Sequence, residues 1–129
     1  QFDPPGMAAW LYACGGVACK FSARPLPPSS RYTAAEGPHF LRANLASHLA
    51  EAEARFEFMA QPRTDAAAMP IEDPRIPWDV AASPFVPVAE ITIPPQRFDT
   101  LERDAFGEAL SFTPWHCLEA HRPLGGINR

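Results

Sequence analysis

The feature that most limits what this chain can fold into is its proline content, sixteen in 129 residues. Proline lacks a backbone N–H and fixes φ, so it interrupts helices and the inner strands of sheets. Three of the prolines lie in residues 25–30 and four in residues 69–85. The sequence therefore predicts short elements joined by long extended connections and argues against a helical bundle.

Between these connections, five stretches show the periodicity of regular structure. Residues 17–23 alternate apolar and polar side chains, which predicts a strand. In residues 38–53, leucines follow an initial proline at helical spacing, which predicts a helix. Residues 56–61 and 86–93 alternate again and predict two more strands, and residues 108–112 predict a short fourth strand.

The predicted fold class is α+β, with three or four strands, one clear helix and long proline-rich connections. A chain of 129 residues has the length of one domain. Four strands with apolar residues on both faces do not close a barrel, so we expect part of a larger antiparallel sheet. Either strand 17–23 or strand 86–93 should then leave unpaired backbone groups at an edge, where the chain would self-associate into a homo-oligomer.

Charge and hydropathy bear on the expected partners. The net charge is −4, and the single lysine and ten arginines are scattered, so nucleic acid is not expected as a partner. No apolar run reaches the roughly 18 residues that a membrane-spanning helix needs. Residues 7–17 are apolar but short, and no basic residue precedes Lys20, so they make a poor signal peptide.

The three cysteines, Cys14, Cys19 and Cys117, are an odd number without the spacing of a disulfide framework. This favours a reducing, cytoplasmic compartment, with a secreted protein carrying one free thiol as the alternative. Cys19 shares its side of the predicted strand with Phe21, so we expect it to be buried and to react slowly. The chain begins with Gln1 rather than Met, and we expect it to be a fragment of a longer protein.

The sequence contains no recognisable catalytic or metal-binding motif, so no residue is predicted to have either role. Cys14 and Cys19 are too far apart for a CxxC pair, and no HExxH motif is present. His116 and Cys117 are adjacent, and side chains of adjacent residues rarely meet as a nucleophile and base. The two Gly-Gly pairs indicate turns rather than phosphate-binding loops.

Several segments, taken in order, resemble the catalase family. Ala-Cys-Lys-Phe (18–21) resembles a strand of that family. Residues 40–61 resemble the family's helix and the strand that follows it. Further phrases are similar to the small bacterial catalase-like haem proteins: Met-Pro-Ile-Glu-Asp (69–73), Ser-Pro-Phe-Val-Pro-Val-Ala (83–89), Ser-Phe-Thr-Pro-Trp-His (111–116) and the final residues 121–129. The resemblance covers about residues 12–129.

The resemblance implies that the chain is part of a catalase-like antiparallel β-barrel that holds haem b. In that family a tyrosinate binds the iron and a histidine moves the peroxide proton. Neither group has a match here, since Tyr12 and Tyr32 stand at other positions, so the resemblance places both outside residues 1–129. Phe112 and Ile127 match haem-contacting positions; the alternatives are a core aromatic and an ordinary loop hydrophobe.

The function implied is action on hydrogen peroxide or an organic hydroperoxide by the full-length, haem-containing protein, with residues 1–129 inactive alone. The alternative is a non-catalytic domain that serves as a packing or interaction scaffold without haem chemistry. Some catalases also bind a dinucleotide through a Trp-Pro-His stretch. Here Trp78 is followed by Asp79 and Val80, so nicotinamide binding is not expected.

Overall fold

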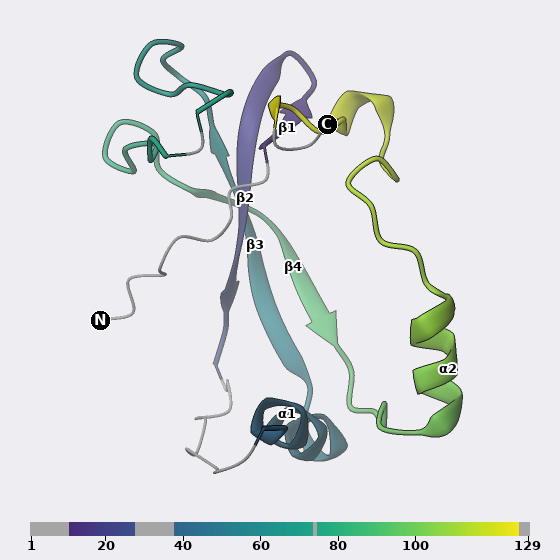
Figure 1. Ribbon diagram of the computed structural model, residues 1–129. Coiled ribbons are helices and arrows are strands. Elements are labelled where there is room, and N and C mark those ends of the chain that lie inside the picture. The colour runs from purple at the N-terminus through teal and green to yellow at the C-terminus, as the bar shows by residue number, and fades with distance from the viewer. Residues whose placement is uncertain (1–10, 28–37, 74, 127–129) are drawn as a thin grey trace. The chain divides into compact units, whose positions relative to one another are not determined.

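The computed structural model describes residues 11–27, 38–73 and 75–126. Its four strands form one antiparallel sheet in the order β1-β2-β3-β4 (Figure 1). Along the chain the elements are β1 (Leu11–Cys14), β2 (Val17–Pro25), α1 (Phe40–Glu51), β3 (Ala54–Pro62), β4 (Val86–Ile93), α2 (Leu101–Ala109) and a 3₁₀ helix, η1 (Glu119–His121).

The expected barrel architecture is wrong for this chain, because the sheet is open. Closure into a barrel requires hydrogen bonds between the first and last strands. Here β1 and β4 stand at opposite ends of the strand order. Among the described residues, β1 pairs with β2 from Leu11 opposite Lys20 to Cys14 opposite Val17. The chain also has a second α-helix, α2, where one clear helix was expected.

The chain divides into two compact units. Unit 1 consists of residues 1–23, 58–89 and 112–129, and unit 2 of residues 24–57 and 90–111. β2, β3 and β4 each contribute residues to both units. The prediction of a single partial domain is not tested by this division, and each unit is described by itself below.

Unit 1 begins with the β1–β2 hairpin. Its two-residue turn, Gly15-Gly16, follows Cys14, which pairs with Val17. Gly15 has φ of 62°, a left-handed conformation that glycine adopts without a steric penalty. The hairpin supplies Leu11 to the core, where it is buried with Met69 and Trp78. Trp78, in the proline-rich connection at residues 69–85, is 4% exposed.

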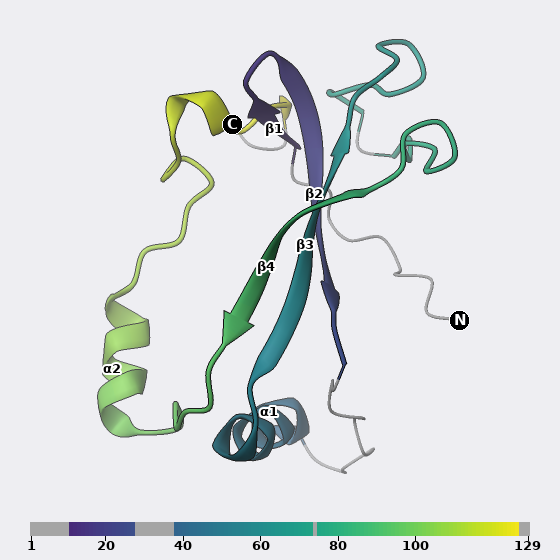
Figure 2. The same cartoon turned by 180° about the vertical axis from the view of Figure 1, so that it is seen from behind.

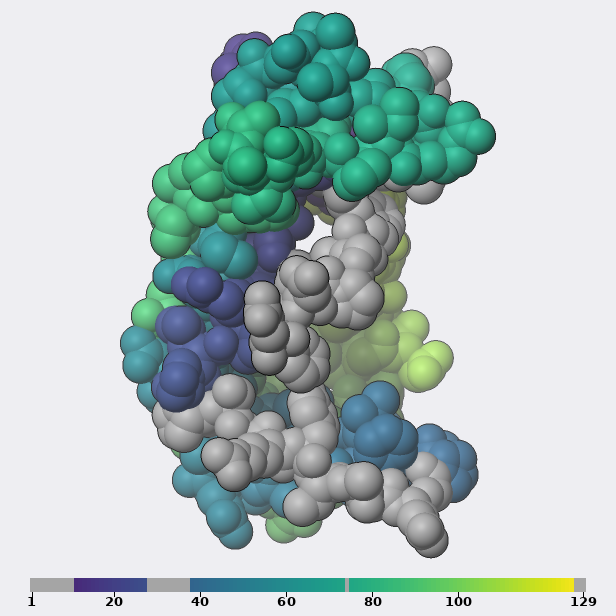
Figure 3. Space-filling model, turned by 90° about the vertical axis from the view of Figure 1, so that its left-hand side faces the viewer, coloured from purple at the N-terminus to yellow at the C-terminus, as the bar shows by residue number. Residues whose placement is uncertain are grey.

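The long connection between β3 and β4 belongs to unit 1 and contains no helix or strand among its described residues, as the prolines predicted. It is held through polar groups instead. Gln61, itself buried, donates from its side chain to the carbonyl oxygen of Ser83 at 2.8 Å, and the Ser83 hydroxyl bonds the carbonyl oxygen of Pro62. These bonds tie the two ends of the connection together, and Figure 3 shows its teal and green residues gathered into one mass.

Unit 2 contains both α-helices. α1 lies within the predicted range 38–53 and is two residues shorter at each end. Of its helically spaced leucines, Leu49 is buried, whereas Leu41 and Leu45 are exposed. α1 contacts the segment after β4, because the backbone N–H of Gln96 donates to the carbonyl oxygen of Leu49 at 2.7 Å.

The predicted strand at residues 108–112 is also wrong, because α2 ends at Ala109 and an extended segment follows it. The helix starts at Thr100, whose side chain accepts a hydrogen bond from the backbone N–H of Arg103. Glu102 and Asp104 lie in its first turn, where negative charge is favourable to the helix dipole. These start signals decided the local structure over the short apolar alternation that suggested a strand.

Candidate functional site

The structure places one of the two predicted haem-contacting residues. Phe112 lies in the extended segment after α2 and is 88% exposed, so its alternative assignment as a core aromatic is wrong. Ile127 lies outside the described residues. Leu118 and Trp115, which follow Phe112 in the chain, are also exposed. This segment therefore presents apolar side chains that unit 1 leaves uncovered.

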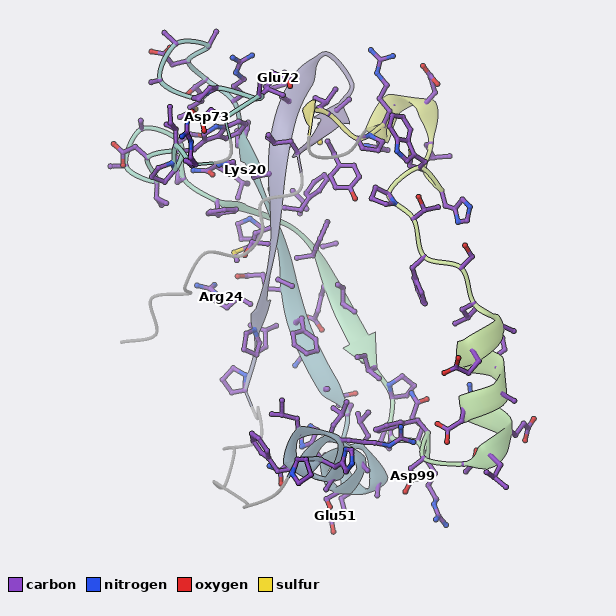
Figure 4. All side chains as sticks on the ribbon, viewed as in Figure 1. Lys20, Arg24, Glu51, Glu72, Asp73 and Asp99 are labelled. Carbon is purple, nitrogen blue, oxygen red and sulfur yellow. The ribbon has the colours of Figure 1, made fainter. Side chains whose placement is uncertain are left out.

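The C-terminal segment is joined to the long connection at two glycines. The backbone N–H of Gly126 donates to the Glu72 carboxylate at 2.8 Å. Gly125 has φ of 85°, and a β-carbon there would lie 2.9 Å from the carbonyl oxygen of Ile71. Only glycine fits this close approach without displacing the backbone. Figure 4 shows Glu72 on the loop that faces this end of the chain.

The same C-terminal segment runs beside β1, which Figures 1 and 2 both show with the yellow segment next to that strand. The N–H of Leu124 donates to the carbonyl oxygen of Leu11 at 2.7 Å, and the N–H of Ala13 donates to that of Arg122 at 2.8 Å. These bonds pair the outer edge of β1, which would otherwise present unsatisfied backbone groups. The segment is thus fixed on both sides.

Between the connection and the C-terminal segment, unit 1 contains a hollow of about 590 Å³. Its charged lining residues are Arg63, Glu72 and Arg122. Its apolar lining comes mainly from Pro70, Ile71, Trp115, Pro123 and Leu124. This volume and this mixture of an apolar wall with few charges are typical of small-molecule sites.

Arg63 is held in place by backbone carbonyl groups. Its Nε donates to the carbonyl oxygen of Met69 at 2.7 Å and its Nη2 to that of Ala66 at 2.8 Å. Within the described part of the chain it forms no ion pair within 4 Å, and its charge acts on the carboxyl of Asp65. Two backbone N–H groups already hold Asp65 and, more than Arg63 does, lower the pKa of its carboxyl.

Arg122, on the C-terminal segment, also lines the hollow. Its guanidinium lies 3.8 Å from the carboxylate of Glu119, and the Glu119 side chain is 93% exposed. An exposed pair at this distance contributes little. The two arginines therefore bring positive charge to one hollow, with Glu72 as the lining carboxylate.

The thiols occupy three environments. Cys19 is buried, as predicted, Cys14 is half-buried and Cys117 is exposed. Burial raises the pKa of the Cys19 thiol to about 12, and the adjacent Cys14 thiol adds to the increase. A thiol with so high a pKa is a poor nucleophile.

Lys20 is placed over an aromatic ring. Its Nζ lies 4.5 Å from the centroid of the Trp78 ring, and burial lowers the pKa of its ammonium group. Figure 4 shows Lys20 beside the loop that carries Asp73. The contact is a cation–π interaction that joins β2 to the connection.

The lining of the hollow includes no residue of a type that ligates haem iron. Those residue types are His, Cys, Met and Tyr. The Tyr12 ring packs against the Phe21 ring, with their centroids 5.5 Å apart. Phe21 in turn stacks on Phe58, with a centroid distance of 5.1 Å. Across residues 11–27, 38–73 and 75–126, no three His, Cys, Asp or Glu side chains are grouped to hold a metal ion.

Sequence reasoning did not identify the residues that build the hollow. Gly125 and Gly126 were interpreted as a turn, and the signal that could have indicated more is the Gly-Gly pair directly after an apolar segment. Trp115 and Arg122 lie in phrases of the resemblance but were given no role, and Arg63 lies in none of them. They line one hollow because the connection and the C-terminal segment fold against each other.

Comparisons of the chain with protein-family models, with curated proteins and with solved structures find no match. Among the described residues, no helix is both long enough and apolar enough to cross a membrane.

Proposed function

We propose that this chain is part of a haem-binding, catalase-like protein that acts on hydrogen peroxide or an organic hydroperoxide. The support comes from the resemblance of its ordered phrases to that family. In the proposed protein, the tyrosinate that binds the iron and the histidine that moves the peroxide proton belong to segments other than residues 1–129, because neither has a match in this sequence. Three free cysteines favour a reducing, cytoplasmic location for it.

One structural observation carries the proposal: the phrases that make the resemblance contact one another. Residues 69–73 and 121–129 are about fifty positions apart, yet Gly126 bonds Glu72, and Gly125 fits against Ile71 as only glycine can. A third phrase, residues 83–89, begins at Ser83, which Gln61 holds in place. Sequence segments that contact one another are expected to be retained as a set. The resemblance of all three segments therefore supports the family assignment better than the resemblance of any one of them.

The proposed role of Phe112 and Ile127 is to provide an apolar wall next to the haem. The exposure of Phe112 fits a residue whose ring is covered by another group, because large apolar surfaces are normally buried against a partner. When bound, haem would supply the peroxide chemistry. No residue of this chain is assigned to its iron.

A haem titration of the protein with its natural flanking sequence tests this proposal. We expect a Soret band of the tyrosinate type and peroxide consumption, and neither from residues 1–129 mixed with haemin. Phe112→Ala should accelerate haem loss about tenfold, in line with the ~1.5–3 kcal/mol gained by burying a phenylalanine. Ile127→Asp should have a larger effect, because it places a charge against an apolar group.

Phe106→Ala is the matched control, since Phe106 is also exposed but lies on α2, outside the matching phrases. Failure of the longer protein to take up haem would contradict the proposal. Equal haem retention in the Phe112, Ile127 and Phe106 variants would contradict the assignment of the wall.

The exposed apolar residues also favour the second candidate, an interaction scaffold without haem chemistry. Leu101 is 90% exposed and Phe112 is 88% exposed, and such residues are typical of surfaces that contact another protein. The titration separates the two candidates. A protein with its natural flanks that takes up no haem, while Leu101→Ser and Phe112→Ser reduce its self-association in sedimentation, would favour the scaffold.

A further inference from the structure

The hollow in unit 1 has the properties of a ligand site that the proposed haem function does not use. We propose that it binds a small organic carboxylate with a flat apolar body. The carboxylate would be received by the guanidinium groups of Arg63 and Arg122. The body would lie against Trp115 and the neighbouring proline side chains.

The first argument is the fixed position of Arg63. Two backbone carbonyl groups hold its guanidinium, at 2.7 and 2.8 Å, and neither neutralises its charge. Two of its five N–H donors are used in these bonds. A donor already held in its binding orientation loses little conformational entropy when an anion arrives.

The second argument is the convergence of two arginines from different segments. Arg63 follows β3, and Arg122 follows η1, yet both line one hollow. Arg122 has a weak, exposed pair with Glu119, at 3.8 Å. Guanidinium groups bind carboxylates through paired, charge-assisted hydrogen bonds, so this arrangement suits a carboxylate better than a neutral ligand.

The third argument is the apolar remainder of the lining. Trp115, Pro70 and Pro123 offer flat, stiff surfaces, and Ile71 and Leu124 extend them toward the buried core. A bare inorganic anion would leave these surfaces in contact with water. A carboxylate with an aromatic or similarly flat body satisfies both parts of the lining.

The test is a titration of the 129-residue chain, without haem, with benzoate, followed by amide chemical shifts. We expect saturable shifts at residues that line the hollow, with a dissociation constant of about 1 mM or lower. Benzamide has the same shape without the charge and should bind at least about tenfold more weakly. Inorganic phosphate should compete poorly.

Arg122→Gln should weaken benzoate binding about tenfold, the effect of losing one charged hydrogen bond. It should leave thermal unfolding unchanged, because the ion pair of Arg122 with Glu119 is long and exposed. Arg103→Gln, on α2 in unit 2, is the matched control and should bind benzoate as the unaltered chain does. Arg122→Lys should give an intermediate affinity, because it keeps the charge and loses the paired donors.

Four results would overturn the proposal: no saturable shift at about 20 mM benzoate, equal binding of benzamide, unchanged affinity in Arg122→Gln, or phosphate competing as well as benzoate. The proposed haem function is unaffected by any of them, because this titration contains no haem and uses different residues.

Discussion

Replacing Gly125 with alanine should destabilise unit 1 more than any other glycine substitution in the described chain. Two costs combine. At φ of 85° a residue with a β-carbon pays the left-handed penalty of about 1–2 kcal/mol. The new β-carbon would also lie 2.9 Å from the Ile71 carbonyl oxygen, closer than the 3.4 Å of an ordinary contact. Forcing backbone apart in this way costs about 1–3 kcal/mol, so we expect a total of ~2–5 kcal/mol.

Two further glycines separate these costs. Gly15 has φ of 62°, and a β-carbon added there would meet no atom within 4 Å, so Gly15→Ala should cost only the backbone penalty. Gly16 has neither constraint, and Gly16→Ala should change the free energy of unfolding by less than ~0.5 kcal/mol. The difference between Gly125→Ala and Gly15→Ala then measures the contact with Ile71.

Urea unfolding followed by tryptophan fluorescence is the appropriate assay, because all three tryptophans of the chain fall in the residue ranges of unit 1. If Gly125→Ala proves no more destabilising than Gly15→Ala, the C-terminal segment does not approach Ile71 closely. The main structural support for the proposed function would then be lost.

Three other predictions address separate parts of the structure. Gln61→Leu should lower the free energy of unfolding by about 2 kcal/mol, because it leaves a buried carbonyl group unpaired. The same change at the half-buried Gln96, whose side chain makes a solvent-exposed bond to the Pro94 carbonyl oxygen, should cost little, and equal urea midpoints would refute this. Above pH 9.0 the unfolded chain releases the Cys19 proton while the folded chain retains it up to about pH 12, so stability should fall as pH rises over this range. Cys19→Val should reduce that fall and Cys117→Val should not, as measured by unfolding at several pH values. Thr100→Ala should weaken α2 by about 1 kcal/mol and speed amide exchange in its first turn; unchanged exchange would mean that Thr100 does not cap a helix.

Three of the strands, β2, β3 and β4, and the proline-rich connections could be predicted because they depend on local rules, whereas β1 (Leu11–Cys14) was not predicted. The side-chain alternation at residues 86–93 matches β4 residue for residue. Proline placement correctly excluded helices and strands from the described part of the long connection. The burial of Cys19 also followed from the side-chain alternation at residues 17–23.

Other predictions failed where one local signal competed with another. The segment before Phe112 became a helix because Thr100 and the acidic first turn supply start signals, which the strand prediction overlooked. In α1 the leucine spacing is helical, but burial depends on what lies against each face, and Leu49 is the leucine of this helix that becomes buried. The barrel expected from the resemblance depends on strand pairing, which the spacing of residues does not report.

By itself, the sequence determined that β2, β3 and β4 are extended, that residues 40–51 can be helical, and where proline forbids both, because these preferences arise within a few residues. Tertiary structure alone decided the rest. It left the sheet open, covered the edge of β1 with the C-terminal segment and set Gly125 against Ile71. It also brought Arg63 and Arg122 to one hollow. These features depend on which segments far apart in the chain lie against one another, and that is set by the packing of whole segments rather than by local preference.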